Sequence, residues 1–219
     1  MKIAFCGDSF CAEWGDPWRG YPAWTMLLLE EFNAAAIQSG ISGDCLFHSY
    51  HALLEHIDKV DYIIFCISEP NRLANKFNIP MNINIAEGLI VDPLPPKDIK
   101  EASRIYYKWI INLDFHATAH RGILMQADQL ILEKKKKCIW FPCFDTSLQD
   151  YKITSGPCGT TPLITIAKRN NPLIPHSNHF SKEQNENMFT LLKDIISCLL
   201  YTSPSPRDQR GSGWAGWGG

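Results

Sequence analysis

The sequence predicts an α/β protein, built as a three-layer αβα sandwich around a mostly parallel, five-stranded sheet. Short apolar runs alternate along the chain with segments whose apolar residues recur at helical spacing. The runs at 2–6 and 61–67 are nearly unbroken, as in strands that helices cover on both faces. Strands that alternate with helices form parallel sheets, and such sheets bind ligands at the carboxyl ends of their strands.

The expected elements follow one another in this order along the chain. The strands are 2–6, 34–37, 61–67, 138–144 and a short fifth strand at 163–167. The helices are 21–32, 48–57, two that share 98–137 with a break near 114–117, and one that begins after Ser181 with a Ser181/Gln184 capping box. Pro142 predicts a bulge, an edge or an early end in the fourth strand. Residues 73–97, rich in Asn and Pro, fit an irregular excursion that either covers substrate or is a passive insertion.

Composition and charge narrow the class of protein. Apolar residues make up 45% of the 219 residues and charged residues 20%, which is typical of a chain that folds around a core. The formal net charge is -2 and the basic residues are scattered apart from the lysine run at 134–137, so we expect no nucleic-acid partner. No apolar run reaches membrane length and the N-terminal apolar stretch is too short for a signal peptide, so we expect a cytoplasmic protein with no membrane partner.

Cysteine and histidine spacing gives little indication of a metal. The eight cysteines contain no CxxC pair, and several lie in apolar runs, as reduced core thiols do. His116 and His120 are four residues apart and would share one side of a helix. No third ligand stands out beside them, which favours a packed or solvated pair over a metal site. We therefore expect neither a metal nor an organic cofactor.

The last 22 residues, 198–219, differ from the rest of the chain in sequence pattern. Residues 198–208, CLLYTSPSPRD, resemble the translation of a transposase sequencing adapter, and the following residues carry no core pattern. We therefore expect one domain over 1–197 and a non-native tail over 198–219.

The first strand ends in GDSF, residues 7–10, which brings a serine to the edge where chemistry is expected. Here the chain resembles the GDSL/SGNH hydrolases, a family of serine esterases with a flavodoxin-like sheet and a Gly-Asp-Ser motif after the first strand. The resemblance implies that Ser9 is the nucleophile and that its backbone N–H is one oxyanion donor, with Asp8 as an accessory residue. The alternative is a serine that only caps a turn.

Two further segments resemble later motifs of the family. In SGISGD, residues 39–44, Gly43 matches the glycine whose N–H is the second oxyanion donor, and a glycine can take the positive φ that this needs. In SEPNR, residues 68–72, Asn71 matches the third donor, although the family's glycine is replaced and Arg72 stands where an acid is usual. Arg72 either binds an anionic substrate group at the rim or forms a structural ion pair.

The last motif lies in HSNHFS, residues 176–181, just before the final helix. His179 matches the family's catalytic base, and the alternative is a histidine that caps the helix. The family has an aspartate three residues earlier, where this chain has His176. Loss of that acid's function costs about 10⁴ in turnover in a serine protease, because the imidazole is no longer oriented. A backbone carbonyl or another carboxylate, such as Asp145 after the fourth strand, would have to orient His179.

These motifs predict a serine hydrolase that cleaves a small ester through an acyl-Ser9 intermediate. An O-acetyl group on a carbohydrate is one such small-molecule substrate. A non-catalytic SGNH-like binding protein is the main alternative, because the usual acid is missing. A nucleotide binder of the flavodoxin or Rossmann kind is disfavoured, since neither GxGxxG nor a P-loop follows the first strand.

Overall fold

Four parallel strands form the sheet at the centre of the molecule. The computed structural model describes residues 1–12, 21–75, 81–82, 97–169 and 180–201. The strands are β1 (Lys2–Cys6), β2 (Ala35–Gln38), β3 (Tyr62–Ile67) and β4 (Lys137–Pro142), in the spatial order β2-β1-β3-β4. All six residues of β3 are buried, as its unbroken apolar run predicted. The α/β class with a parallel sheet is confirmed.

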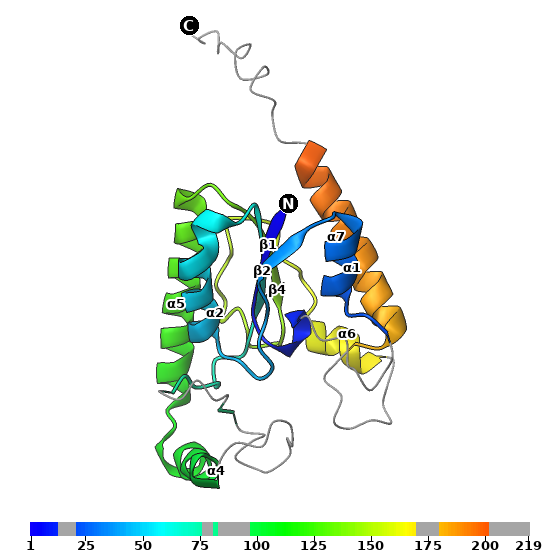
Figure 1. Ribbon diagram of the computed structural model, residues 1–219. Helices are drawn as coiled ribbons and strands as arrows, with labels where there is room; N and C mark the ends of the chain where they lie inside the picture. Colours follow the sequence, from blue (N-terminus) through cyan, green and yellow to red (C-terminus); the bar gives the residue numbers. More distant parts are fainter. Residues whose placement is uncertain (13–20, 76–80, 83–96, 170–179, 202–219) are drawn as a thin grey trace, which may run out of the picture.

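Helices cover both sides of the sheet and give the predicted three layers (Figure 1). One side, called the α7 side below, carries α1 (Trp24–Glu31), α6 (Leu163–Arg169) and α7 (Lys182–Tyr201). The other, the α5 side, carries α2 (Leu46–His56) and α5 (Leu113–Glu133). Within the described segments, no helix is both long and apolar enough to cross a bilayer.

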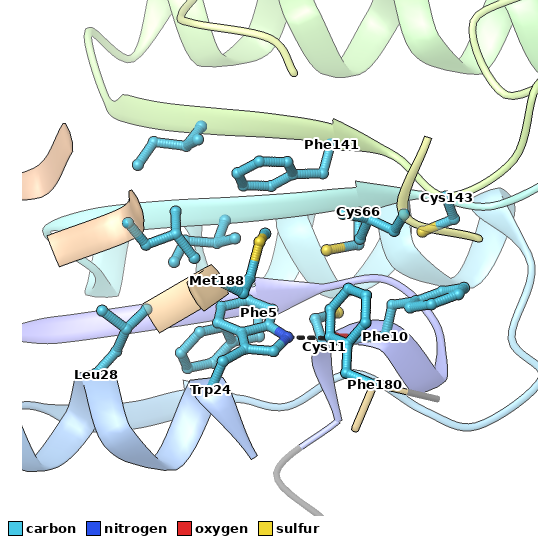
Figure 2. Packing of buried hydrophobic residues seen from close by; sticks show 14 of the residues in the cluster. Phe5, Phe10, Cys11, Trp24, Leu28, Cys66, Phe141, Cys143, Phe180 and Met188 are labelled. Atoms are coloured by element: carbon cyan, nitrogen blue, oxygen red, sulfur yellow. Dashed lines mark hydrogen bonds between the residues drawn. The ribbon is translucent and has the colours of Figure 1, made fainter. Parts of the chain in front are cut away.

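A separate apolar cluster fills the space on each side of the sheet. On the α7 side, Trp24 packs edge-on against Phe5 with ring centroids 5.7 Å apart, and Met188 of α7 joins them (Figure 2). On the α5 side, Trp140 stacks on Phe65 at 4.6 Å. Since alternate residues of each strand point to opposite sides, the strands supply both clusters.

The predicted fifth strand at 163–167 was wrong, because this segment forms helix α6. Its buried residues Leu163, Ile164 and Ala167 lie at helical spacing and share one face. The N–H of Ile164 donates to the carbonyl of Cys143 at 2.9 Å, which fixes the start of the helix beside the end of β4. The sheet therefore has four strands among the described residues.

The segment expected as two helices over 98–137 contains α4 (Lys97–Ile105), the π-helical turn η3 (Tyr106–Ile110) and α5. The break falls at 111–112 and not near 114–117. The side chain of Asn112 accepts the N–H of Phe115 at 3.0 Å, so it caps α5 and sets this boundary. β4 ends at Pro142, in agreement with the predicted early end.

The start of α7 has the predicted capping box. The N–H of Ser181 donates to the side chain of Gln184 at 2.7 Å, and the N–H of Gln184 donates to Ser181 Oγ at 3.3 Å. The helix continues to Tyr201, past residue 197, and Lys137 Nζ donates to the carbonyl of Leu199 at 2.8 Å. The assignment of 198–219 to a non-native tail stays a prediction.

The eight cysteines are all free thiols, as predicted. Six of them are buried: Cys6, Cys11, Cys45, Cys66, Cys138 and Cys143. Desolvation raises the pKa of the Cys143 thiol to about 12, so it stays protonated at neutral pH.

Candidate active site

Ser9 begins a short 3-10 turn, η1 (Ser9–Cys11), at the carboxyl end of β1. Asp8 caps the turn, because its Oδ1 accepts the N–H of Phe10 at 3.1 Å. Ser9 is half-buried, and its hydroxyl makes no hydrogen bond with any residue that the structure describes. As the first residue of a helical turn, Ser9 also has an N–H without an acceptor inside the turn. The hydroxyl and the backbone N–H of Ser9, the two groups that a serine nucleophile uses, are thus available to a substrate.

The carboxylate of Asp8 is completely buried and holds the turn in place. Its Oδ1 also accepts the Cys143 thiol at 3.5 Å, and its Oδ2 lies 3.1 Å from Arg72 Nη1. Asp8 Oδ2 makes no hydrogen bond with the described residues, so the ion pair with Arg72 is what offsets the cost of burying its charge. Asp8 is therefore an anchor that joins β1 to the ends of β3 and β4.

Arg72 is the cationic partner of Asp8, and its side chain is only 6% exposed. Its Nε donates to Glu69 at 3.2 Å, and its Nη1 donates to the carbonyl of Asp44 at 3.2 Å. The guanidinium also lies 4.8 Å from the centroid of the Phe144 ring. Burial alone would lower the pKa of Arg72, but the carboxylates of Asp8 and Glu69 raise it above its usual value. These contacts favour the structural ion pair over a rim residue that binds an anion.

The loop that carries Gly43 lies against the serine turn. Ile41 donates its N–H to the carbonyl of Gly7 at 3.0 Å. Gly40 lies so close to the turn that a Cβ there would come within 2.6 Å of the Asp8 carbonyl, so this contact requires glycine. Gly43 has φ +75°, in agreement with the positive φ expected for it. The loop can therefore present the Gly43 N–H near the end of β1.

Asn71 lies beyond the end of β3, the strand that pairs with β1. Its backbone is held by the hydroxyl of Tyr107, which donates to the carbonyls of Asn71 and Met81. Its side-chain Oδ1 is buried and makes no hydrogen bond within the described part of the chain. Since the neighbouring residues Asp8 and Arg72 are in contact, the segments of Ser9 and Asn71 lie side by side at one edge of the sheet.

The expected base His179 and its neighbour His176 lie outside the described residues. Phe180, directly after His179, packs on Phe10, directly after Ser9, with ring centroids 5.5 Å apart (Figure 2). The start of α7 thus lies against the serine turn. Asp145 is exposed and follows the end of β4 by three residues, so it lies at the same edge of the sheet.

The two histidines of α5 each have a partner of their own. His120 is buried and its Nε2 lies 2.8 Å from the carbonyl of Ser147, and burial lowers its pKa to about 4. His116 Nε2 lies 2.6 Å from the hydroxyl of Tyr106. These contacts favour the packed pair over a shared metal site.

Among the described residues, the side chains of Asp44, Cys45 and His48 have ligand atoms within 4.8 Å of one another. Asp44 Oδ1 accepts the N–H of Cys45 at 2.9 Å and lies 2.7 Å from His48 Nδ1. The hydrogen bond to Asp44 is the main cause that raises the pKa of His48 to about 10. The carboxylate of Asp44 therefore holds both other members of this group through hydrogen bonds, to the N–H of Cys45 and to the ring of His48.

A groove of about 980 Å³ lies beside the Gly43 loop, between that loop, α2 and the segment after Asn71. Six of its eleven lining residues are polar: Gln38, Asp44, His48, His51, Glu55 and Asn75. Ser9 does not line the groove. Sequence reasoning missed this groove, although an acid and a histidine four residues apart, directly after Gly43, were a readable signal.

Comparison with known proteins identifies the fold. No family model and no curated protein sequence matches the chain. A crystal structure of the acetyl xylan esterase AlAXEase superposes with a TM-score of 0.52 at 12% identity, covering 90% of this chain and 100% of that one. The lipase/acylhydrolase from Enterococcus faecalis superposes with a TM-score of 0.52 at 15% identity, covering 90% and 95%. The chain therefore has the fold of the GDSL/SGNH hydrolases, as its motifs predicted.

Proposed function

We propose that the protein is a serine esterase that hydrolyses a small ester, such as an O-acetyl group on a carbohydrate. The observation that carries this proposal is the meeting of three strand-end segments, those of Ser9, Gly43 and Asn71, at the carboxyl edge of the sheet. Parallel α/β sheets bind ligands at this edge. The hydroxyl of Ser9 makes no hydrogen bond with the described residues, and the fold is shared with an acetyl xylan esterase and a lipase/acylhydrolase.

In the proposed acylation step, His179 takes the proton of Ser9 Oγ while this oxygen attacks the ester carbonyl carbon. The negative charge moves to the carbonyl oxygen, which accepts hydrogen bonds from the N–H groups of Ser9 and Gly43 and from the amide of Asn71. When the tetrahedral intermediate collapses, His179 gives its proton to the leaving alcohol. An acyl-Ser9 ester remains.

In the deacylation step, His179 takes a proton from water, and the resulting hydroxide attacks the acyl carbon. The acid is released and Ser9 regains its proton. An orienting partner for His179 is needed, because His176 replaces the usual aspartate. Asp145, or a backbone carbonyl, would accept the second ring N–H of His179.

The test is hydrolysis of p-nitrophenyl acetate by the wild type and by Ser9→Ala. We expect a loss of kcat of at least about 10³, because no nucleophile replaces the serine. Ser197→Ala is the matched control, since Ser197 is also half-buried but lies on α7 near its carboxyl end. Equal rates in the wild type and in Ser9→Ala would sink the proposal.

A non-catalytic SGNH-like binding protein is the second candidate, because His176 stands where the orienting acid belongs. A fluorophosphonate probe separates the two, since it reacts only with an activated serine. Labelling of the wild type and not of Ser9→Ala supports the esterase. A folded wild type that the probe does not label supports the binding protein.

A further inference from the structure

We infer that the groove on α2, beside the Gly43 loop, binds the carbohydrate part of the ester, with Phe47 and His51 as a stacking surface and His48 as a hydrogen-bond donor. This inference rests on the proposed function, because it assigns a place to the larger half of the substrate. Ser9, Gly43 and Asn71 act on the ester carbonyl alone, so the rest of the substrate needs a site of its own.

The groove is continuous with the expected oxyanion donors. Ile41 and Asp44 line it and flank Gly43, while Ala74 and Asn75 line it and follow Asn71 by three and four residues. A substrate whose carbonyl lies between Gly43 and Asn71 would therefore have this groove beside it. Its volume, about 980 Å³, lies at the upper end of the range for small-molecule sites and exceeds the need of an acetyl group.

An exposed aromatic pair forms one wall of the groove. Phe47 is 44% exposed, and its ring centroid lies 4.4 Å from that of His51, one turn along α2. Single exposed aromatic side chains are common, but here two rings contact each other along a groove, with 54° between their planes. The C–H faces of a sugar ring are apolar and can pack on the face of the Phe47 ring, with the tilted His51 ring beside it.

A charged donor stands at the same wall. Asp44 is 5% exposed at its side chain and holds His48 Nδ1 at 2.7 Å, which fixes the imidazole ring and leaves Nε2 as the second nitrogen. An imidazolium donates from both nitrogens, so Nε2–H can donate to a sugar hydroxyl. Hydrogen bonds from a charged donor are stronger than those from a neutral one.

The lining of the groove argues against an acyl chain as its occupant. A long acyl chain offers no hydrogen-bond partner to the exposed carboxylate of Glu55 or to His48 Nε2, so covering these groups with it is costly. A sugar offers hydroxyl groups as partners to the polar residues and its C–H faces to Phe47. The mixed wall therefore fits a carbohydrate.

The experiment measures kcat/KM for an acetylated xylooligosaccharide and for p-nitrophenyl acetate in Phe47→Ala. We expect the ratio of the first to the second to fall about tenfold, mostly through KM, because ground-state binding of the sugar is lost. The matched control is Phe115→Ala, since Phe115 is 66% exposed on α5 and does not line the groove. The ratio should stay at the wild-type value in this control.

Two outcomes would overturn the inference while the esterase proposal stands. One is an equal ratio in Phe47→Ala and Phe115→Ala. The other is a selective loss of p-nitrophenyl octanoate hydrolysis in Phe47→Ala, which would assign the groove to the acyl chain.

A binding measurement keeps the inference testable even if the protein hydrolyses no ester. Unacetylated xylohexaose is titrated into Ser9→Ala, and the ring signals of His48, His51 and His120 are followed by NMR. We expect His48 and His51 to shift, His120 to stay, and the shifts to vanish when Phe47→Ala is added. Absence of any shift at millimolar xylohexaose contradicts the inference.

Discussion

The two sides of the sheet differ in how they support the site. On the α7 side, the serine turn is held by apolar packing, with Phe10 against Phe180 and with Trp24 Nε1 donating to the Phe10 carbonyl at 2.8 Å (Figure 2). On the α5 side, the Gly43 loop and the groove carry polar groups joined by hydrogen bonds. Tight packing suits the proposed nucleophile, which would have to stay in one position, and an open polar wall suits the proposed sugar, which would have to enter and leave.

Arg72 connects the two sides, and its replacement should have the largest effect. In Arg72→Met, Asp8 would stay buried without its cation, so we expect a loss of about 3–5 kcal/mol in the free energy of unfolding. Urea-induced unfolding measures this loss. The serine turn should loosen with it, and the probe reaction at Ser9 should slow.

The control for Arg72 is Arg104→Met, which removes an exposed arginine–glutamate ion pair from the surface of α4. Arg104 and Glu101 are 52% and 54% exposed, so the unfolding transition should stay where it is. If both variants unfold at the same urea concentration, the buried ion pair does not join the two sides.

A matched pair of tryptophans compares the two cores directly. Trp24→Phe would leave the Phe10 carbonyl without its donor, and Trp140→Phe would remove the bond from Trp140 Nε1 to Ser155 Oγ at 3.1 Å. We expect each to cost about 1–3 kcal/mol in urea unfolding. Only Trp24→Phe should also lower kcat, because Phe10 follows Ser9. Equal effects on kcat would show that the α7 side does not hold the nucleophile more directly than the α5 side.

Two histidines on the α5 side should titrate far apart and should change the free energy of unfolding in two different pH ranges. Burial lowers the pKa of His120 to about 4, so its folded form resists protonation and stability falls as the pH drops from 6.5 towards 4. The hydrogen bond that His48 donates to Asp44 raises the pKa of His48 to about 10, so the stability it adds is present below pH 6.5 and lost as the pH rises towards 10. NMR titration of the ring protons measures both values.

The variants His120→Gln and His48→Gln assign these effects. The first should flatten the acid limb of the stability curve, and the second should flatten the alkaline limb. If His48 titrates near 6.5, the contact with Asp44 does not keep it charged and it cannot be the donor inferred above.

The sequence predicted those features that depend on local pattern. The unbroken apolar run of β3, the helical spacing in α2 and the Ser181/Gln184 capping box each appear in the structure as predicted. The prediction of a strand at 163–167 was wrong because a run of five apolar and small residues fits a strand and one face of a helix equally well. Its first-turn contact with Cys143 decides between them, and that contact is distant in sequence.

The role of Arg72 and the presence of the groove could not be predicted from local sequence pattern, because both depend on residues that are distant in sequence. The two roles that the sequence left open for Arg72 differ in whether it meets Asp8, which lies 64 residues earlier. The groove forms from three segments that only the tertiary structure brings together. Ser9, Gly43 and Asn71 could be named from motifs, but their shared place at one edge follows from the pairing of β1 with β3 and from the Asp8–Arg72 contact.

Helix α2 has two faces with separate tasks. Leu46 and Leu53 are almost fully buried and pack against the α5 side of the sheet. Phe47 and His51 line the groove instead. Substitutions on the outer face therefore carry little folding penalty and leave the serine turn untouched. Natural selection, or a laboratory library restricted to that face, can therefore change what the groove binds while the turn that carries Ser9 is inherited intact.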